Sequence, residues 1–132
     1  MNSTIFTFSV HGAKNYPWRK EQSDLDIELP DRTADAVYLA TVEDGLGRAL
    51  AAARPDLAIY LAGADPFEKD RLGRLAVSRA GLAERDRLVF DACQRFSLPV
   101  AVTMAGGYAA DVTDTVDIQF ETVRQAAAVS GC

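Results

Sequence analysis

The sequence predicts an α/β fold, a three-layer α-β-α arrangement with a mostly parallel sheet at its centre. Three observations predict it. Apolar runs of strand length alternate with segments whose apolar residues recur every three or four positions, which is the element order of a parallel sheet. The runs at 57–62 and 99–104 are nearly continuous in apolar residues and do not alternate, as is typical of strands covered on both faces. The 132 residues contain no repeat and no linker, so we expect one domain, 1–132.

The first half of the chain is predicted to form two strands and a helix. Residues 5–10 alternate between apolar and polar side chains, which predicts a strand. After a polar loop, the alternation over 25–29 predicts a short strand with one exposed side. Asp31 or Thr33 then offers the N-cap of a helix that Pro55 ends. The apolar face of this helix is formed by Leu39, Val42, Leu46, Leu50 and Ala53.

The second half is predicted to alternate strand, helix, strand and helix. The strand over 57–62 comes first, and Ser78 offers the N-cap of the next helix. Pro99 opens the following strand, a position where its missing N–H is tolerated. The threonine-rich segment 111–117 is predicted to be a polar connection to a last helix over 116–129. The apolar faces of these helices are Leu82, Val89, Cys93 and Phe96 in the first and Phe120, Val123 and Ala127 in the second.

Composition excludes several classes of partner. The net charge is −5 and the chain has no Lys/Arg block, so neither nucleic acid nor an anionic membrane is expected to bind. No apolar segment reaches the roughly 18 residues of a membrane span, and the N-terminus does not resemble a signal peptide. Two cysteines, Cys93 and Cys132, do not make a disulfide framework. We therefore expect a cytoplasmic protein.

Asp65 is the main candidate for chemistry. It follows the strand over 57–62 and the small residues Gly63 and Ala64, and the carboxyl ends of strands are where open α/β sheets hold ligands. Two interpretations are open from spacing alone: a metal ligand at the mouth of the sheet, or a carboxylate that caps the following turn. For Asp70, a salt bridge or turn hydrogen bond is the expected role, with Arg71 or Arg74 as partner.

A second glycine-rich turn ends the strand that Pro99 opens. Gly106 and Gly107 indicate a positive φ or a close approach of the backbone to another group. Tyr108 would then stand at the same end of the sheet as Asp65, where a phenol hydroxyl beside a metal can stabilise an oxyanion. The alternative is a glycine-rich turn followed by a tyrosine that only packs.

Two further sites are weaker candidates. His11 is the only histidine of the chain, and no orienting carboxylate accompanies it in the sequence, so a structural role is expected over that of a general base. The loop over 15–20 places Tyr16 and Trp18 among charges. This loop is interpreted either as a cover for the edge of the sheet or as an aromatic wall of a substrate channel.

Taken together, these segments resemble the zinc-dependent histone deacetylase and acetylpolyamine amidohydrolase family. The resemblance extends from about Ile5 to Arg124 and lies in the second half of the family's domain. The matching motifs are Phe6-Thr7-Phe8-Ser9-Val10-His11-Gly12, Asn15-Tyr16-Pro17, Ser23-Asp24-Leu25-Asp26-Ile27, Gly63-Ala64-Asp65-Pro66, Asp70-Arg71-Leu72-Gly73, Gly81-Leu82-Ala83-Glu84-Arg85-Asp86 and Ala105-Gly106-Gly107-Tyr108.

The resemblance implies a role for each matched position. Asp65 would be a zinc ligand and Tyr108 the hydroxyl that stabilises the oxyanion during hydrolysis of an acetyl-amide bond. Tyr16, Gly106 and Gly107 would contact the substrate, with Tyr16 lining the acyl channel. The implied cofactor is zinc, and the implied substrate is an acetylated amine or acetyl-lysine.

Two motifs of the family are missing. The chain has neither an Asp-x-His motif nor tandem histidines, which supply the other zinc ligands and the acid/base pair. We therefore expect the C-terminal half of a deacetylase fold, with weak or no zinc binding and no activity unless another chain supplies the missing half. The alternative is a non-catalytic module that self-associates, most simply as a homodimer, or binds a partner. A receiver or flavodoxin-like fold is disfavoured, because the first strand is followed by neither an acidic pair nor a phosphate loop.

Overall fold

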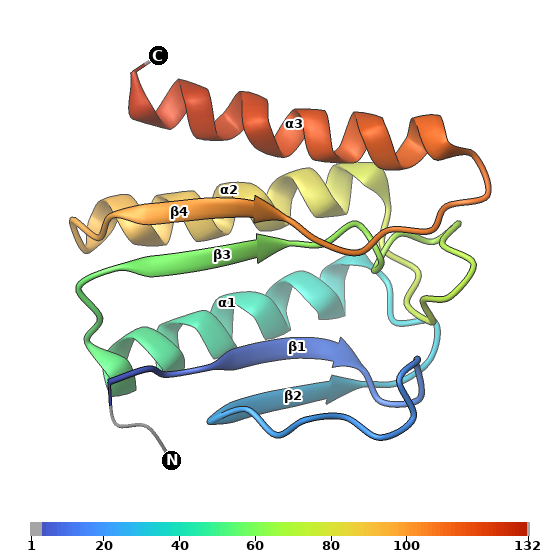
Figure 1. Ribbon diagram of the computed structural model, residues 1–132, viewed down its shortest axis with the longest axis horizontal. Coiled ribbons are helices and arrows are strands. Elements are labelled where there is room, and N and C mark those ends of the chain that lie inside the picture. The colour runs from blue at the N-terminus through green and yellow to red at the C-terminus, as the bar shows by residue number, and fades with distance from the viewer. Residues whose placement is uncertain (1–3, 132) are drawn as a thin grey trace.

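A computed structural model describes residues 4–131 of the chain (Figure 1). Strands and helices alternate in the predicted order after a first strand pair. The elements are β1 (Phe8–Gly12), β2 (Leu25–Leu29), α1 (Asp35–Ala53), β3 (Ala58–Ala62), α2 (Arg79–Arg95), β4 (Val100–Met104) and α3 (Val112–Ser130). In the described residues no helix is long and apolar enough to cross a membrane.

Helix boundaries follow from local capping, and two of them differ from prediction. The Ser78 hydroxyl caps α2 as predicted, accepting from the Gly81 N–H at 3.0 Å. Helix α3 starts before the predicted position, because the Asp111 carboxylate accepts from the Thr113 N–H at 2.9 Å and so caps the threonine-rich segment. Neither Asp31 nor Thr33 caps α1, whose N-cap is Ala34 with no side-chain hydrogen bond.

Both strand pairs in residues 4–131 are parallel, as predicted. Strand β1 pairs with β2 from Phe8 opposite Leu25 onward, and β3 pairs with β4 from Ala58 opposite Val100 onward. In residues 4–131 these are two separate two-stranded units and not one continuous sheet. Figure 1 shows a gap between β1 and β3, with α1 visible in that gap.

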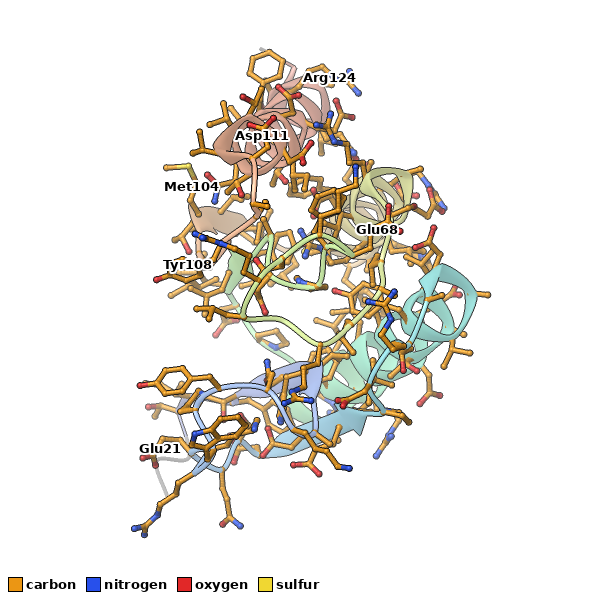
Figure 2. All side chains as sticks on the ribbon, turned by 90° about the vertical axis from the view of Figure 1, so that its right-hand side faces the viewer. Glu21, Glu68, Met104, Tyr108, Asp111 and Arg124 are labelled. Carbon is orange, nitrogen blue, oxygen red and sulfur yellow. The ribbon has the colours of Figure 1, made fainter. Side chains whose placement is uncertain are left out.

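Helices α1 and α2 lie on one side of the strands, and α3 lies beside β4 and packs on α2. Helix α1 packs on β1 and β2, α2 packs on α1, and α3 packs on α2. Figure 2 shows this arrangement along the strands, with α1 and α2 on one side and Tyr108 on the other. The opposite face of β3 is open, because Ile59 and Leu61 are 67% and 68% exposed. The described residues thus form two parallel strand pairs, with helices α1 and α2 on one side of them.

The buried core joins both strand pairs at their carboxyl ends. Its members come from β2, all three helices and the loops after β3 and β4: Leu29, Tyr38, Val42, Ala64, Phe67, Leu75, Val77, Leu82, Ala109 and Ile118. The predicted face of α2 is buried at Leu82, Val89 and Cys93, but Phe96 lies at the C-cap and is exposed. The predicted face of α3 is also wrong, because Ile118 and Thr122 are buried while Phe120 and Val123 are exposed.

Two glycines of α1 are expected to respond oppositely to alanine. A β-carbon at Gly45 would lie 2.5 Å from Phe8 Cζ, whereas nothing lies within 4 Å at Gly47. Gly45→Ala should therefore destabilise the chain by about 1–3 kcal/mol. Gly47→Ala should stabilise it by about 0.5–1 kcal/mol, because alanine loses less backbone entropy in a helix. Urea unfolding of the two variants measures both, and equal effects would contradict the close approach of α1 to β1.

Candidate functional site

The loops after β3 and β4 meet at the carboxyl end of this strand pair. Gly63 turns the chain sharply, with its N–H donating to the Leu61 carbonyl at 3.1 Å. The Ala64 N–H donates to the Gly106 carbonyl at 2.7 Å and so joins the two loops. Because the strands are parallel, this contact places Asp65 next to the glycine-rich turn that leads to Tyr108.

A glycine is required before the Asp65 carboxylate at Gly63, whereas the position of Gly106 leaves room for a β-carbon. A β-carbon at Gly63 would lie 2.5 Å from Asp65 Oδ1, and one at Gly106 would lie 3.6 Å from the same atom. Asp65 is half-buried between these turns. The turn after it is closed by the Phe67 N–H, which donates to the Ala64 carbonyl at 3.1 Å. The backbone therefore makes this turn, and the carboxylate is not needed to cap it.

The surroundings of Asp65 favour its neutral form. Burial raises the pKa of the carboxyl above its ordinary value, and the negative charge of Asp70 raises it further. A hydrogen bond from its own backbone N–H and the Arg85 guanidinium oppose this shift. A half-buried carboxylate at a strand end whose pKa is raised by burial is a candidate for a functional position.

Asp65→Asn is expected to raise the free energy of unfolding at pH 7. Since the folded-state pKa lies above the unfolded one, the wild-type stability is highest below the unfolded pKa and falls as pH rises through the folded pKa. The advantage of the asparagine variant should therefore shrink as the pH is lowered toward 4. Urea unfolding between pH 4 and 8 measures it, with the exposed Asp56→Asn as control. A variant less stable than wild type at pH 7 would contradict the effect of burial.

Asp70 fastens the Tyr108 turn to the loop after β3. Its Oδ1 accepts from the Leu72 and Gly73 N–H groups at 2.9 and 2.7 Å, and its Oδ2 accepts from the Tyr108 N–H at 2.6 Å. The expected turn hydrogen bond is thus present, but neither predicted arginine takes part through its side chain. Arg74 pairs with Asp31 at 3.0 Å instead. The link to Tyr108 spans 38 residues, so local spacing gave no signal for it.

Of the two glycines before Tyr108, Gly107 serves a close approach and not a positive φ. Neither has φ in the left-handed region. A β-carbon at Gly107 would lie 2.8 Å from Thr115 Cγ2 and 3.0 Å from Ala64 Cβ, which packs the turn against α3 and the first loop. The Tyr108 side chain is 56% exposed at the open side of the sheet (Figure 2).

The other sequence candidates lie on β1 and the loop that follows it. Tyr16 is 67% exposed, so its predicted contact with substrate rests on the family resemblance. His11 Nδ1 is 2.8 Å from Ser9 Oγ, and its Nε2 is 3.8 Å from Glu28 Oε1. Glu28 of β2 is thus a carboxylate close to His11 that the sequence did not indicate, and the structural role of His11 stays a prediction.

A buried ion pair supports the turn before Asp65, and sequence reasoning did not single it out. Arg85 donates from Nη1 to the Gly63 carbonyl at 2.6 Å and from Nε and Nη2 to Asp86 Oδ1 at 3.0 and 2.8 Å. Asp86 also accepts from the Tyr60 and Thr122 hydroxyls, both at 2.5 Å. Burial raises the pKa of Tyr60 above its ordinary value, so its hydroxyl stays protonated as a donor. The local signal for this network in the sequence is the pair of adjacent opposite charges, Arg85 and Asp86.

The residues present do not by themselves fit a catalytic zinc ion. Such an ion takes three protein ligands and one open position. Within residues 4–131, no three His, Cys, Asp or Glu side chains gather in a way that could hold a metal. Asp65 offers one donor at the expected place, and the other ligands would have to come from outside the described chain.

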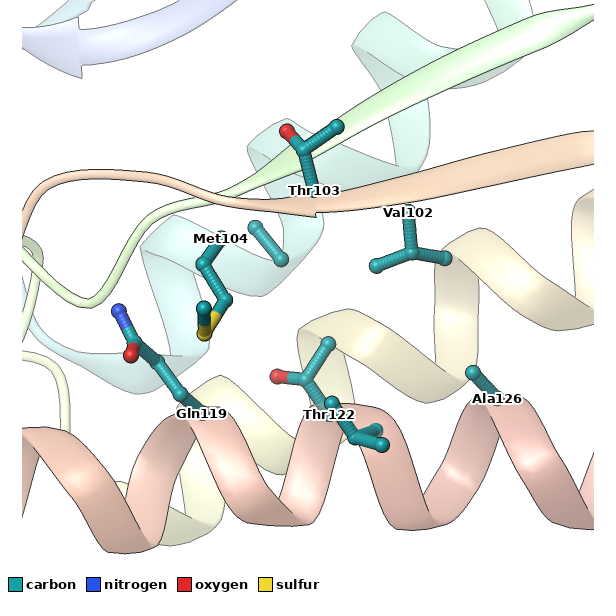
Figure 3. Close-up of a pocket in the computed structure, with 8 residues that line it drawn as sticks. Val102, Thr103, Met104, Gln119, Thr122 and Ala126 are labelled. Carbon is teal, nitrogen blue, oxygen red and sulfur yellow. The ribbon is translucent and has the colours of Figure 1, made fainter.

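The hollow between β4 and α3 is apolar and lies apart from this chemistry (Figure 3). It has a volume of about 240 Å³. Its lining consists of Ala62, Val102, Thr103, Met104, Gln119, Thr122, Val123 and Ala126. None of these side chains is ionisable, so the hollow offers no acid, base or metal ligand.

Comparison with known proteins identifies the family. Residues 1–121 match the histone deacetylase domain. The chain belongs to the histone deacetylase domain family. An uncharacterised protein of Picosynechococcus is 43% identical over 113 residues, which are 86% of this chain and 38% of that protein. Histone deacetylase 2 of Arabidopsis thaliana is 27% identical over 110 residues, which are 81% of this chain and 28% of that protein.

Solved structures show the same fold. The acetylpolyamine aminohydrolase of Burkholderia pseudomallei superposes with a TM-score of 0.77 at 20% identity, over 97% of this chain and 39% of that one. An HDAC homologue from Aquifex aeolicus gives a TM-score of 0.74 at 19% identity, over 96% of this chain and 35% of that one. The chain therefore has part of the deacetylase fold and spans less than two fifths of each of these relatives, as the missing motifs predicted.

Proposed function

We propose that this chain contributes Asp65 and Tyr108 to a zinc-dependent amidohydrolase site of the deacetylase type, which is complete only when further sequence is present. One observation carries the proposal: in a member of this family, a half-buried carboxylate and a tyrosine turn meet at the carboxyl end of two parallel strands. Asp65 would be one zinc ligand, and the Tyr108 hydroxyl would donate to the oxyanion formed from an acetyl-amide carbonyl. Gly106, Gly107 and Tyr16 would contact the acetylated amine or acetyl-lysine.

The isolated chain is expected to bind zinc weakly and to leave acetyl-lysine peptides intact. One carboxylate gives too few ligands, and the chain has no histidine pair to handle the proton from water. Calorimetric titration with zinc and an acetyl-lysine peptide assay measure the two properties. Tight one-to-one zinc binding that Asp65→Ala abolishes would contradict the incomplete site.

A chimera tests whether Asp65 and Tyr108 have the proposed roles when the rest of a deacetylase domain is present. In it, this chain replaces the matching segment of the Picosynechococcus relative, and the parent protein is the control. Asp65→Ala should lower the zinc content, whereas Tyr108→Phe should keep zinc and lower kcat about 10²–10³-fold, the usual loss for one oxyanion donor. Zinc content unchanged by Asp65→Ala would remove Asp65 from the ligand set.

A second candidate function, self-association, is supported by the open face of β3. Ile59 and Leu61, which are 67% and 68% exposed, lie on that face. Exposed apolar patches and unpaired strand edges promote association. Light scattering at micromolar concentration should then give about twice 14.3 kDa. A monomer with a cooperative thermal transition would contradict a homodimer.

A further inference from the structure

The ammonium group of Lys20 binds the backbone of the loop that connects β1 to β2. Its Nζ donates to the carbonyl oxygens of Asn15 at 2.8 Å, Pro17 at 3.1 Å and Ala13 at 3.3 Å. Because an ammonium group has three donors, each of them has one carbonyl acceptor here. Lysine side chains on a surface usually extend their charge into water, whereas Lys20 is half-buried and points back into its own loop. Lys20 thus supplies an internal cation to this loop.

The three hydrogen bonds close an arc of the chain, residues 13–17, whose middle has little other backbone support. Residues 13–24 all lie in the described part of the chain, and none of them belongs to a helix or strand. The turn hydrogen bond from the Asn15 N–H to the Gly12 carbonyl is long, at 3.5 Å. Hydrogen bonds from a charged donor are about twice as strong as neutral ones. The shape of the arc therefore depends chiefly on Lys20.

The closed arc presents two aromatic side chains to solvent. Tyr16 lies between Asn15 and Pro17, whose carbonyls both bind Lys20, and it is 67% exposed. Trp18 follows at the outer tip of the loop and is 73% exposed. Large aromatic side chains carried by an anchored backbone are typical of binding surfaces, because their rings offer contact area at a small entropic cost.

The base of the arc contacts the segment that carries Asp65. A β-carbon at Gly12 would lie 3.6 Å from Asn15 Cγ and 3.7 Å from Leu75 Cδ2, so the arc and the loop after β3 meet there. Figure 1 shows all four strands running in the same direction, which places the start of the arc at the same end of the molecule as Asp65 and Tyr108.

We infer that Lys20 is a positioning residue, which holds Tyr16 in place for the substrate and sets substrate affinity without taking part in the chemistry. The contribution of Tyr16 rests on the proposed function, whereas the closure of the arc by Lys20 does not. Without the ammonium group, three carbonyls lose their common donor and the arc opens. Substrate binding must then order the arc again, which weakens affinity. Asp65 and Tyr108 keep their places, because their turns are joined by other contacts.

Lys20→Ala in this chain alone tests the closure of the arc. Backbone order parameters from nitrogen-15 relaxation should fall below about 0.6 at Tyr16 and Trp18, the range of flexible segments. Trp18 is the only tryptophan of the chain, so its fluorescence anisotropy reports the same loop independently and should also fall. Lys14→Ala is the matched control, because Lys14 is an exposed lysine of the same loop, and it should change neither quantity.

Chemical rescue separates hydrogen bonding from charge. Propylammonium has the three carbons and the nitrogen that alanine lacks relative to lysine, so it should restore the order parameters of the Lys20→Ala variant. Tetramethylammonium carries the same charge without any N–H donor and should not restore them at the same concentration. Equal restoration by both ions would contradict the hydrogen-bonded role of Lys20.

The chimera with the Picosynechococcus relative tests the effect on substrate. Lys20→Ala should raise KM about tenfold, the cost of ordering a loop side chain on binding, and leave kcat and zinc content unchanged. Propylammonium should lower KM again. Tyr16→Ala should raise KM similarly, and adding Lys20→Ala to it should change KM little further, because Lys20 acts through Tyr16.

Three results would overturn the inference. Order parameters that stay at the wild-type value in Lys20→Ala exclude the closure of the arc by Lys20. A lower kcat at constant KM in the chimera excludes a role in substrate affinity, and so do additive effects of the Tyr16 and Lys20 variants. A wild-type chimera that does not hydrolyse acetyl-lysine contradicts the proposed function instead, and the order parameters and their rescue still decide whether Lys20 holds the arc.

Discussion

Replacing Asp86 with alanine is expected to remove a large part of the folding free energy of this chain. Asp86 is 1% exposed and accepts hydrogen bonds from Arg85, Tyr60 and Thr122. Its loss leaves the buried Arg85 charge without a partner, and breaking such a pair costs about 3–5 kcal/mol. A domain has only about 5–15 kcal/mol in total. Urea unfolding followed by circular dichroism measures the loss.

Two further variants separate the charge from general disruption. Asp91→Ala removes an exposed carboxylate of α2, which pairs with Arg87. This change should leave the midpoint of urea unfolding unchanged. Adding Arg85→Met to Asp86→Ala should recover part of the stability, because it removes the unpaired buried charge. A double variant as unstable as the sum of the single ones would contradict the electrostatic origin of the loss.

Asp70→Ala is expected to release the Tyr108 turn from the loop after β3. Asp70 is 9% exposed, and its carboxylate accepts from three backbone N–H groups. Hydrogen bonds to charged groups contribute about 1.5–3 kcal/mol each, and stranded N–H groups add a desolvation cost, so we expect a loss of about 3 kcal/mol or more. Amide exchange should accelerate at Leu72, Gly73 and Tyr108 beyond the average of the chain.

The exposed neighbour Glu68→Ala is the control for Asp70, because it lies in the same loop and its side chain faces solvent (Figure 2). In the chimera described above, Asp70→Ala should lower kcat while zinc content stays unchanged, since Asp70 positions Tyr108 through its backbone. Tyr108 amide exchange that is no faster than in wild type would contradict this positioning role.

The sequence by itself determined the element order, the parallel direction of the strands and the family. Continuous apolar runs and three- and four-residue spacing carry that information locally, and so does the Ser78 cap of α2. The sequence also indicated the tight turn before Asp65. Gly63 is required there, because a β-carbon would lie 2.5 Å from Asp65 Oδ1. Missing motifs likewise predicted that only part of the fold would be present.

Only the tertiary structure decided which groups hold the site together. The bonds from Asp70 to the Tyr108 turn and from Arg85 to Gly63 span 38 and 22 residues, and no local pattern encodes a contact between loops on different strands. The exposed face of α3 and the break between β1 and β3 were likewise beyond the sequence. Apolar spacing predicts that Phe120 and Ile59 are covered, but what covers a side chain depends on neighbouring elements, and in residues 4–131 those neighbours are missing.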